Sequence, residues 1–465
     1  MKPATRISLF LVPAALLILV MWATFHVGQG LELLSGIHPS TAAPAGAKAV
    51  AQAPDAFHHP LAILILQIIL IITASRICAW LCKRIGQPAV MGEIIAGILL
   101  GPSLVGTLFP QFSAFVFPAA SLGDLQMLSQ IGLILFMFVI GIEIDISVFK
   151  KKAGSAMLIS YFGMVVPFML GIGLSLYLYR HYAPANIHFY AFSLFIGIAM
   201  SITAFPVLSR IIRERGITHT RLGSVAIAAA ATDDLVAWCL LTFIVAIAKA
   251  GTGTSTLYTL AAVIIYIAIM LFLVRPVITR MMKQSLQDNT LKRSTLAIIF
   301  IILLVSAYCC EVIGIHALFG AFFTGAILPR DHNFRKTLID KIEDVSMVLL
   351  LPIFFVFTGL KTQIGLLNDP SLWLSCAIII FIAVAGKFGG SSIAARISGE
   401  SVQDSLSIGA LMNTRGLVEL VVLNIGYDLG ILSPQLFTMM VLMALITTLM
   451  TNPAINLINR YYERK

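Results

Sequence analysis

The stretch SVAIAAAATDDLVAWCLLTFIVAIA, residues 224–248, is long and apolar enough to cross a bilayer, yet it carries two adjacent carboxylates, Asp233 and Asp234. An acidic side chain at the centre of a membrane helix costs roughly 2.5–3.5 kcal/mol on insertion scales. Neighbouring residues point about 100° apart around a helix, so both carboxylates can face one cavity wall, where they repel each other. A costly acidic pair of this kind indicates a functional site.

The whole chain has the composition of a polytopic membrane protein. Of its 465 residues, 59% are hydrophobic and 11% are charged, and the mean hydropathy is +0.97, whereas soluble domains carry about 25% charged residues. Its six cysteines form no CxxC pair and its nine histidines form no HExxH motif. We therefore expect no disulfide framework, no resident metal and no cofactor.

Runs of about 20 apolar residues, the length of a membrane-spanning helix, predict thirteen spans. They cover residues 61–82, 87–107, 122–146, 154–179, 189–211, 222–247, 257–279, 293–312, 314–329, 345–365, 371–394, 403–426 and 434–456. A further apolar run, 8–27, precedes an Ala/Pro-rich segment and predicts either an extra span or a cleaved signal peptide. The chain then divides into an N-terminal hydrophobic segment with its linker (1–60), a transmembrane domain (61–458) and a short cytoplasmic tail (459–465).

Lysine and arginine residues predict how these spans are oriented. Twenty-two of them lie in one set of alternate connections, and the other set holds only Arg180, Lys249 and Lys361. The rich side is cytoplasmic by the positive-inside rule, so we expect a cytoplasmic C-terminus and, as location, the inner (plasma) membrane of a bacterium. The net charge of +10 is thus a sign of topology, and nucleic acid is excluded as a partner.

Thirteen spans divide into six, one linking helix and six, which gives the two halves opposite orientations. The fifth span of each half is interrupted by residues that break a helix or leave its backbone polar. These residues are Ser201, Thr203 and Pro206 in the first half, and Asn413, Thr414, Arg415 and Gly416 in the second. The pattern predicts an all-α membrane protein with an inverted repeat of 13 helices and two crossed, broken helices.

Several other charges lie within predicted spans. Lys387 is isolated in an apolar run and is a candidate partner for the acidic pair, because a buried lysine, unlike arginine, can lose its proton. Arg415 and Glu419 are spaced to pair on one helix, and Arg415 could also offset helix-end dipoles at the break. We place Glu93 toward the cytoplasmic portion of its helix and Glu143 toward the periplasmic portion of its helix. For both acids, roles in packing, in gating and in ion contact are alternatives.

Carboxylate oxygens suit hard cations and protons alike, so the pair is a place where the two can compete. The pattern indicates a secondary active transporter, and the alternative is a passive cation channel. An intramembrane aspartyl protease is excluded, since its two aspartates lie on facing helices and the two aspartates here are adjacent, with no GxGD motif.

Five segments make the chain resemble a known family. They are GQPAVMGEIIAGILLGPSLVG (86–106), FMFVIGIEIDI (136–146), TDD followed by AW (232–238), FTGLKTQIG (357–365) and MNTRGLVELVVLNIG (412–426). Over residues 61–458 the sequence resembles the monovalent cation:proton antiporter-2 family, the sodium/proton and potassium/proton exchangers. The resemblance implies antiport of Na⁺ or K⁺ against protons by a homodimer whose mobile core moves like an elevator.

The resemblance also implies roles for single residues. Asp234 would bind the transported cation or proton with Asp233 beside it, Asp233 would pair with Lys387, and Thr203 matches the polar residue at the first helix break. An Asp–Asp pair accompanied by a lysine is similar to the electrogenic branch of the family.

The predicted topology can be tested by accessibility. Single cysteines replacing Lys151 and Arg335, in a chain whose native cysteines are serine, should react with a membrane-impermeant thiol reagent only from the cytoplasmic side. A cysteine replacing Asn368 should react only from the periplasmic side. Labelling of all three from one side would contradict the inverted plan.

Overall fold

The computed structural model describes residues 60–143, 153–185, 187–218, 220–250, 254–286, 293–329 and 331–463. Within these ranges every regular element is a helix. The predicted N-terminal segment, including the apolar run 8–27, lies outside the described residues except for Pro60, as do Lys151 and the last two residues of the tail.

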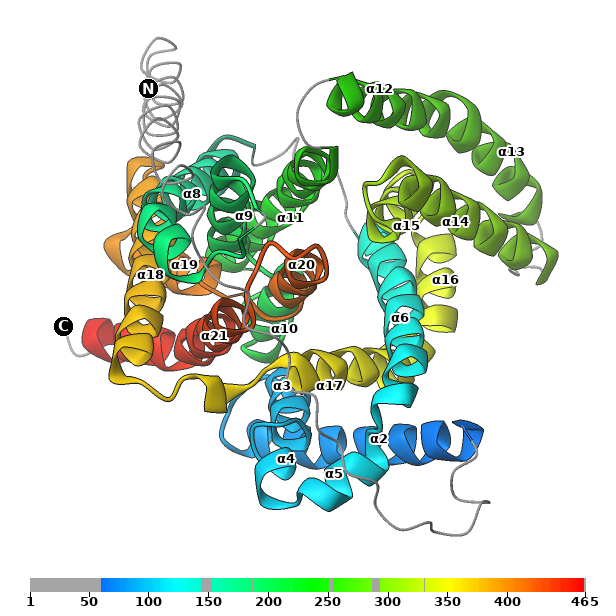
Figure 1. Ribbon diagram of the computed structural model, residues 1–465. Helices are drawn as coiled ribbons and strands as arrows, with labels where there is room; N and C mark the ends of the chain where they lie inside the picture. Colours follow the sequence, from blue (N-terminus) through cyan, green and yellow to red (C-terminus); the bar gives the residue numbers. More distant parts are fainter. Residues whose placement is uncertain are drawn as a thin grey trace.

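The helices gather into two groups (Figure 1). The first, here called the scaffold bundle, contains α2 (Pro60–Arg84), α3 (Ala89–Leu100), α4 (Val105–Leu108), α5 (Pro110–Val116), α6 (Leu122–Glu143), α12 (Thr254–Ile269), α13 (Arg275–Leu286), α14 (Arg293–Ile313), α15 (Ala317–Ala326), α16 (His332–Val345) and α17 (Leu351–Lys361). The second, the crossing bundle, contains α8 (Ala153–Tyr182), α9 (Phe189–Ser201), α10 (Phe205–Glu214), α11 (Arg221–Ala250), α18 (Pro370–Ile397), α19 (Val402–Met412), α20 (Gly416–Asp428) and α21 (Pro434–Glu463).

Short connecting turns complete these elements. Single π-helical turns, Met270–Val274 and Ser346–Leu350, join α12 to α13 and α16 to α17. Short 3₁₀ turns lie at Ala119–Ser121, before α6, and at Ile364–Leu366, after α17.

The predicted spans correspond to helices of the structure, with one correction. Among the described residues, eleven helices are long and apolar enough to cross a membrane, and α19 with α20 forms a twelfth span bent by 40°. The remaining predicted span, 314–329, is the ten-residue helix α15. At 1.5 Å per residue α15 is about 15 Å long, half the hydrocarbon thickness, so a count of thirteen full spans is not confirmed.

The inverted repeat is visible in how the second helix of each half packs. A Cβ atom added to Gly92 or Gly97 of α3 would collide with the backbone of α2 or α17, respectively. In the second half, Gly320 and Gly325 of α15 approach the backbones of α14 and α6 in the same way. Each second helix therefore packs on the first helix of its own half and on the third helix of the other half. Glycine allows this because it lets two backbones meet without side chains between them.

The two interrupted helices cross at their breaks. Residues 202–204 separate α9 from α10, residues 413–415 separate α19 from α20, and the backbone N–H of Ala204 donates to the carbonyl of Thr414 at 3.0 Å. Three residues predicted within the breaks lie in the adjoining half-helices instead. Ser201 ends α9, Gly416 begins α20, and Pro206 lies in the first turn of α10, where its missing N–H leaves no helical bond unmade.

Candidate functional site

Asp233 has a complete set of hydrogen-bond donors. Its carboxylate accepts from the hydroxyl of Ser160 on α8 (2.5 Å), from the hydroxyl of Thr203 in the first break (2.7 Å) and from the ammonium of Lys387 on α18 (2.7 Å). All four side chains are buried. The structure thus brings the predicted residues Asp233, Thr203 and Lys387 together and adds Ser160, which the sequence analysis did not identify.

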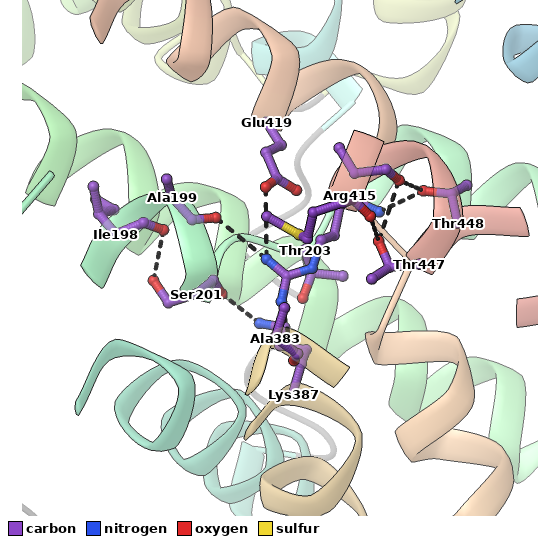
Figure 2. Close-up of polar contacts among 12 residues, drawn as sticks. Ile198, Ala199, Ser201, Thr203, Ala383, Lys387, Arg415, Glu419, Thr447 and Thr448 are labelled. Carbon is purple, nitrogen blue, oxygen red and sulfur yellow. Dashed lines mark hydrogen bonds and ion pairs between the residues drawn. The ribbon is translucent and has the colours of Figure 1, made fainter. Parts of the chain in front are cut away.

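Lys387 also contacts the end of a half-helix. Its ammonium donates to the backbone carbonyl of Ser201, the last residue of α9, at 2.5 Å (Figure 2). The carbonyls in the last turn of a helix lack intrahelical partners and carry the negative end of the helix dipole. Lys387 therefore satisfies a carbonyl that the break exposes, and at the same time pairs with Asp233.

Arg415 is a second buried cation at the same helix end. Its guanidinium donates to the carbonyls of Ala199 on α9 and Ala383 on α18, each at 3.2 Å, and lies 3.7 Å from the carboxylate of Glu419 (Figure 2). Both functions considered for Arg415 from the sequence are thus present in one side chain. It pairs with Glu419 one turn along the chain, and it offsets the exposed carbonyls of α9.

Helix α21 satisfies the backbone of the second break. The hydroxyl of Thr448 accepts from the backbone N–H groups of Arg415 and Gly416, at 3.0 and 3.1 Å, and the hydroxyls of Thr414 and Thr451 lie 3.2 Å apart. Freed backbone groups at membrane depth are tolerated only where protein or water satisfies them. Thr448 supplies that partner and keeps α20 aligned behind its break.

Asp234 differs from its neighbour in having no comparable partner. Its side chain is fully buried, and within the described part of the chain neither carboxylate oxygen has a hydrogen bond of standard geometry. Only a looser contact joins it to the backbone N–H of Phe205, the first residue of α10. The positive end of the α10 dipole thus faces Asp234. The side-chain oxygen of Asn413, in the other break, is also buried without a partner.

The buried charges at the crossing do not balance. Asp233, Asp234 and Glu419 are three carboxylates, and Lys387 and Arg415 are two cations, all of them fully buried. With every group ionised, the crossing is one positive charge short. Since an uncompensated buried charge is strongly unfavourable, one monovalent cation or one proton is needed there. Within the described part of the chain, the oxygens of Asp234 and of Glu419 both lack hydrogen bonds of standard geometry, but Glu419 is paired with Arg415, so Asp234 is the carboxylate without a cation of its own.

The acids considered in other spans lie away from the crossing. Glu93 on α3 is buried near Arg210, and Glu143, the last residue of α6, lies near Arg213. Because Arg210 and Arg213 are both on α10, the two acids lie toward the same end of the molecule. The expectation that Glu93 and Glu143 lie in opposite portions of the membrane is therefore wrong.

Known proteins resemble this chain in sequence and in fold. The family model described as sodium/hydrogen exchanger, transmembrane, matches residues 69–457. The Na(+)/H(+) antiporter NhaS4 of Synechocystis is 43% identical over 398 residues, which cover 85% of this chain and 97% of that protein. The K(+)/H(+) antiporter 1 of Saccharomyces cerevisiae is 34% identical, and the match covers 86% of this chain and 47% of the yeast protein.

A plant relative, the Cation/H(+) antiporter 17 of Arabidopsis thaliana, is 39% identical over 87% of this chain, which spans about half (49%) of its length. Among solved structures, the sodium proton antiporter MjNhaP1 from Methanocaldococcus jannaschii has the same fold. Its TM-score is 0.62 at 15% identity, and the match covers 86% of this chain and 99% of that one. The all-helical fold, its crossed breaks and these matches lead to one conclusion: the chain belongs to the sodium/hydrogen exchanger family of membrane transporters.

Proposed function

We propose that this protein exchanges a monovalent cation, Na⁺ or K⁺, for protons across the membrane, and that Asp234 is the group for which the two compete. The missing positive charge at the crossing carries the proposal. As long as Lys387 is charged, a proton or a cation at Asp234 balances the site equally well, so either can occupy it, but both together would leave an excess of charge. This exclusion is what couples the two fluxes.

The arrangement of Lys387 supports a second exchanged proton. Lys387 is bonded to Asp233, and we assign this pairing to the state in which Asp234 carries a proton. An arriving cation would draw both carboxylates toward itself, so that Lys387 loses its anionic partner and, in a buried site, its proton. Two protons then exchange for one cation, so the cation-bound crossing carries one net negative charge that the protonated crossing does not. Each cycle moves this one net charge across the membrane, worth about 2.3 kcal/mol per 100 mV.

Either alkali cation is compatible with the relatives, because proteins named for sodium and for potassium both match. A passive channel is less well supported. The relatives that match are antiporters, and the carboxylates of the crossing are fully buried in packed helices and do not line an open pore.

We infer that the crossing bundle moves against the scaffold bundle like an elevator. The glycine approaches at α3 and α15 lie within the scaffold, and those of Gly386 and Gly390 on α18 lie against α8 within the crossing bundle. Between the bundles the contacts are of a more reversible kind. Trp238 of α11 lies beside Phe322 of α15, with ring centroids 6.2 Å apart, and its indole N–H has no partner among the described residues.

Polar contacts between the bundles lie mostly at helix ends. They join Lys361 to Asp428, Gln363 to Thr438, Gln87 to Leu449 and Gly86 to Asn452. The hydrogen bond from Asn424 to Thr358 is the deeper exception. These contacts can exchange partners during a displacement, whereas close backbone packing cannot.

We also infer a homodimer in the inner membrane, and a monomeric mass by light scattering in detergent would contradict it.

The substitution Asp234→Asn tests the proposed function. In proteoliposomes with an imposed pH gradient, wild type should move protons on addition of Na⁺ or K⁺, and Asp234→Asn should not, because an amide cannot alternate between a proton and a cation. Asp124→Asn, at an exposed acid in the first turn of α6, is the matched control and should keep wild-type exchange. Near-normal exchange by a folded Asp234→Asn protein would refute the proposed site.

Cross-linking tests the elevator. Arg210 of α10, Val90 of α3 and Met347, before α17, line the same cavity. In a chain without native cysteines, a bis-methanethiosulfonate bridge between Arg210→Cys and Met347→Cys joins the two bundles and should stop exchange until a reductant breaks it. The same bridge between Val90→Cys and Met347→Cys stays within the scaffold and should leave exchange intact. Continued exchange with the first pair fully bridged would contradict relative movement.

A further inference from the structure

A cavity of about 240 Å³ lies between the bundles, away from the crossing. Its walls come from α2, α3, α10 and the turn that leads into α17. Three basic side chains line it, Arg76 and Lys83 from the scaffold bundle and Arg210 from the crossing bundle, together with one acid, Glu93. Basic groups on separate helices thus converge on one space, which the proposed exchange does not use.

The acids beside this cavity neutralise its basic side chains only in part. Among the described residues Arg76 and Lys83 have neither an ion pair nor a hydrogen bond through their side chains, and Arg210 bonds to Glu214 at 3.0 Å. Glu93 is only 8% exposed, and its carboxylate forms no ion pair within 4.0 Å among the described groups. With Glu93 and Glu214 both counted, the cavity retains a surplus of one positive charge. It therefore favours an anion.

The surroundings of the cavity place it at the membrane surface. Lys83 and Arg84 are the last two residues of α2, and Arg84 lies over the ring of Trp80, 4.0 Å from its centroid. Trp80 lines the cavity and is 51% exposed, and the neighbouring Ile77 and Leu81 on α2 are also exposed. An exposed tryptophan with basic residues at the end of an apolar helix is typical of the level of the lipid headgroups.

We propose that this cavity binds the phosphate of an anionic phospholipid from the leaflet on the Lys/Arg-rich side. Arg76, Lys83 and Arg210 would hold the phosphate oxygens, and the acyl chains would lie along the exposed apolar face of α2. Basic pockets between transmembrane helices recognise anionic headgroups in this way. The exposed apolar surface beside the cavity favours a lipid over free phosphate. Both carry the same oxyanion, but free phosphate has no apolar part that could contact this surface.

A lipid in this position would contact both bundles. Because Arg210 lies on α10, whose first residue faces Asp234, the headgroup would favour the arrangement of the bundles that keeps Arg210 near Arg76 and Lys83. This consequence for transport rate rests on the proposed function. Binding itself does not, and it should persist in the transport-deficient Asp234→Asn protein.

Lipid binding can be measured by titrating the delipidated full-length protein in neutral detergent. The titrants are phosphatidylglycerol, phosphatidylcholine and inorganic phosphate, and retained lipid is counted by native mass spectrometry. We expect selective retention of phosphatidylglycerol, with affinity about 30-fold weaker in Arg76→Gln/Lys83→Gln, since each basic residue near an anionic surface contributes roughly a factor of five. The control, Arg280→Gln/Lys341→Gln, removes two exposed cations from α13 and α16 and should bind as wild type does.

Four results would overturn the proposal. The first is equal retention of phosphatidylglycerol and phosphatidylcholine, and the second is equal weakening by the two double variants. The third is full displacement of the lipid by inorganic phosphate at the same concentration, which would make free phosphate the ligand. Loss of phosphatidylglycerol binding in Asp234→Asn would show that binding depends on the crossing and would contradict a separate site. Since Arg76 and Lys83 are exposed, their replacement leaves the buried packing intact.

Discussion

The charge deficit at the crossing is the constraint on which the rest of the structure depends. Three carboxylates and two cations share a space closed to solvent, and the difference is one positive charge, which the proposed exchange supplies as a proton or a cation. In hydrocarbon such a group of charges is stable only if the protein supplies polar partners on all sides. The broken helices contribute to this, because the end of α9 offers carbonyls to Lys387 and Arg415 and the start of α10 directs the N–H of Phe205 toward Asp234.

Close packing of α8 against α18 allows these partners to meet. A Cβ at Gly386 would lie 2.9 Å from the Cα of Pro167, and one at Gly390 would lie 2.9 Å from the carbonyl oxygen of Phe162. Lys387 is held between these two approaches, facing Asp233, with little freedom to point elsewhere. The lysine can therefore lose its carboxylate partner without moving away from the site, as the proposed electrogenic cycle requires.

Much of this arrangement could be predicted from the sequence, because the cost of burying a charge makes each intramembrane charge informative. Asp233, Asp234 and Lys387 stand out against apolar runs for this reason, and the polar residues of the two breaks stand out likewise. Ser160 and Thr448 give no such signal, since a hydroxyl in a membrane helix can bond to its own backbone. Their roles arise only from the packing of α8 and α21 against the crossing.

The helix boundaries, too, could be predicted only in part from the sequence. Hydropathy located the thirteen apolar segments, but it could not show that α15 is too short to span, since its ten residues lie within a longer apolar run. The breaks were also placed a residue or more too broadly. Pro206 suits the first turn of a helix as well as a break, and only the path of the backbone decides between the two. The basic cavity joins residues more than a hundred positions apart, so no local pattern could reveal it.

The most direct test of the central claim is to count protons released when a cation binds. Na⁺ or K⁺ is added to the purified protein in weakly buffered detergent solution with a pH-sensitive dye, and choline serves as the control cation. Competition at Asp234 predicts proton release in wild type, about one proton fewer per cation in Lys387→Met, and none in Asp234→Asn. Full proton release from Asp234→Asn would contradict the account, because the proton and the cation would then compete at another group.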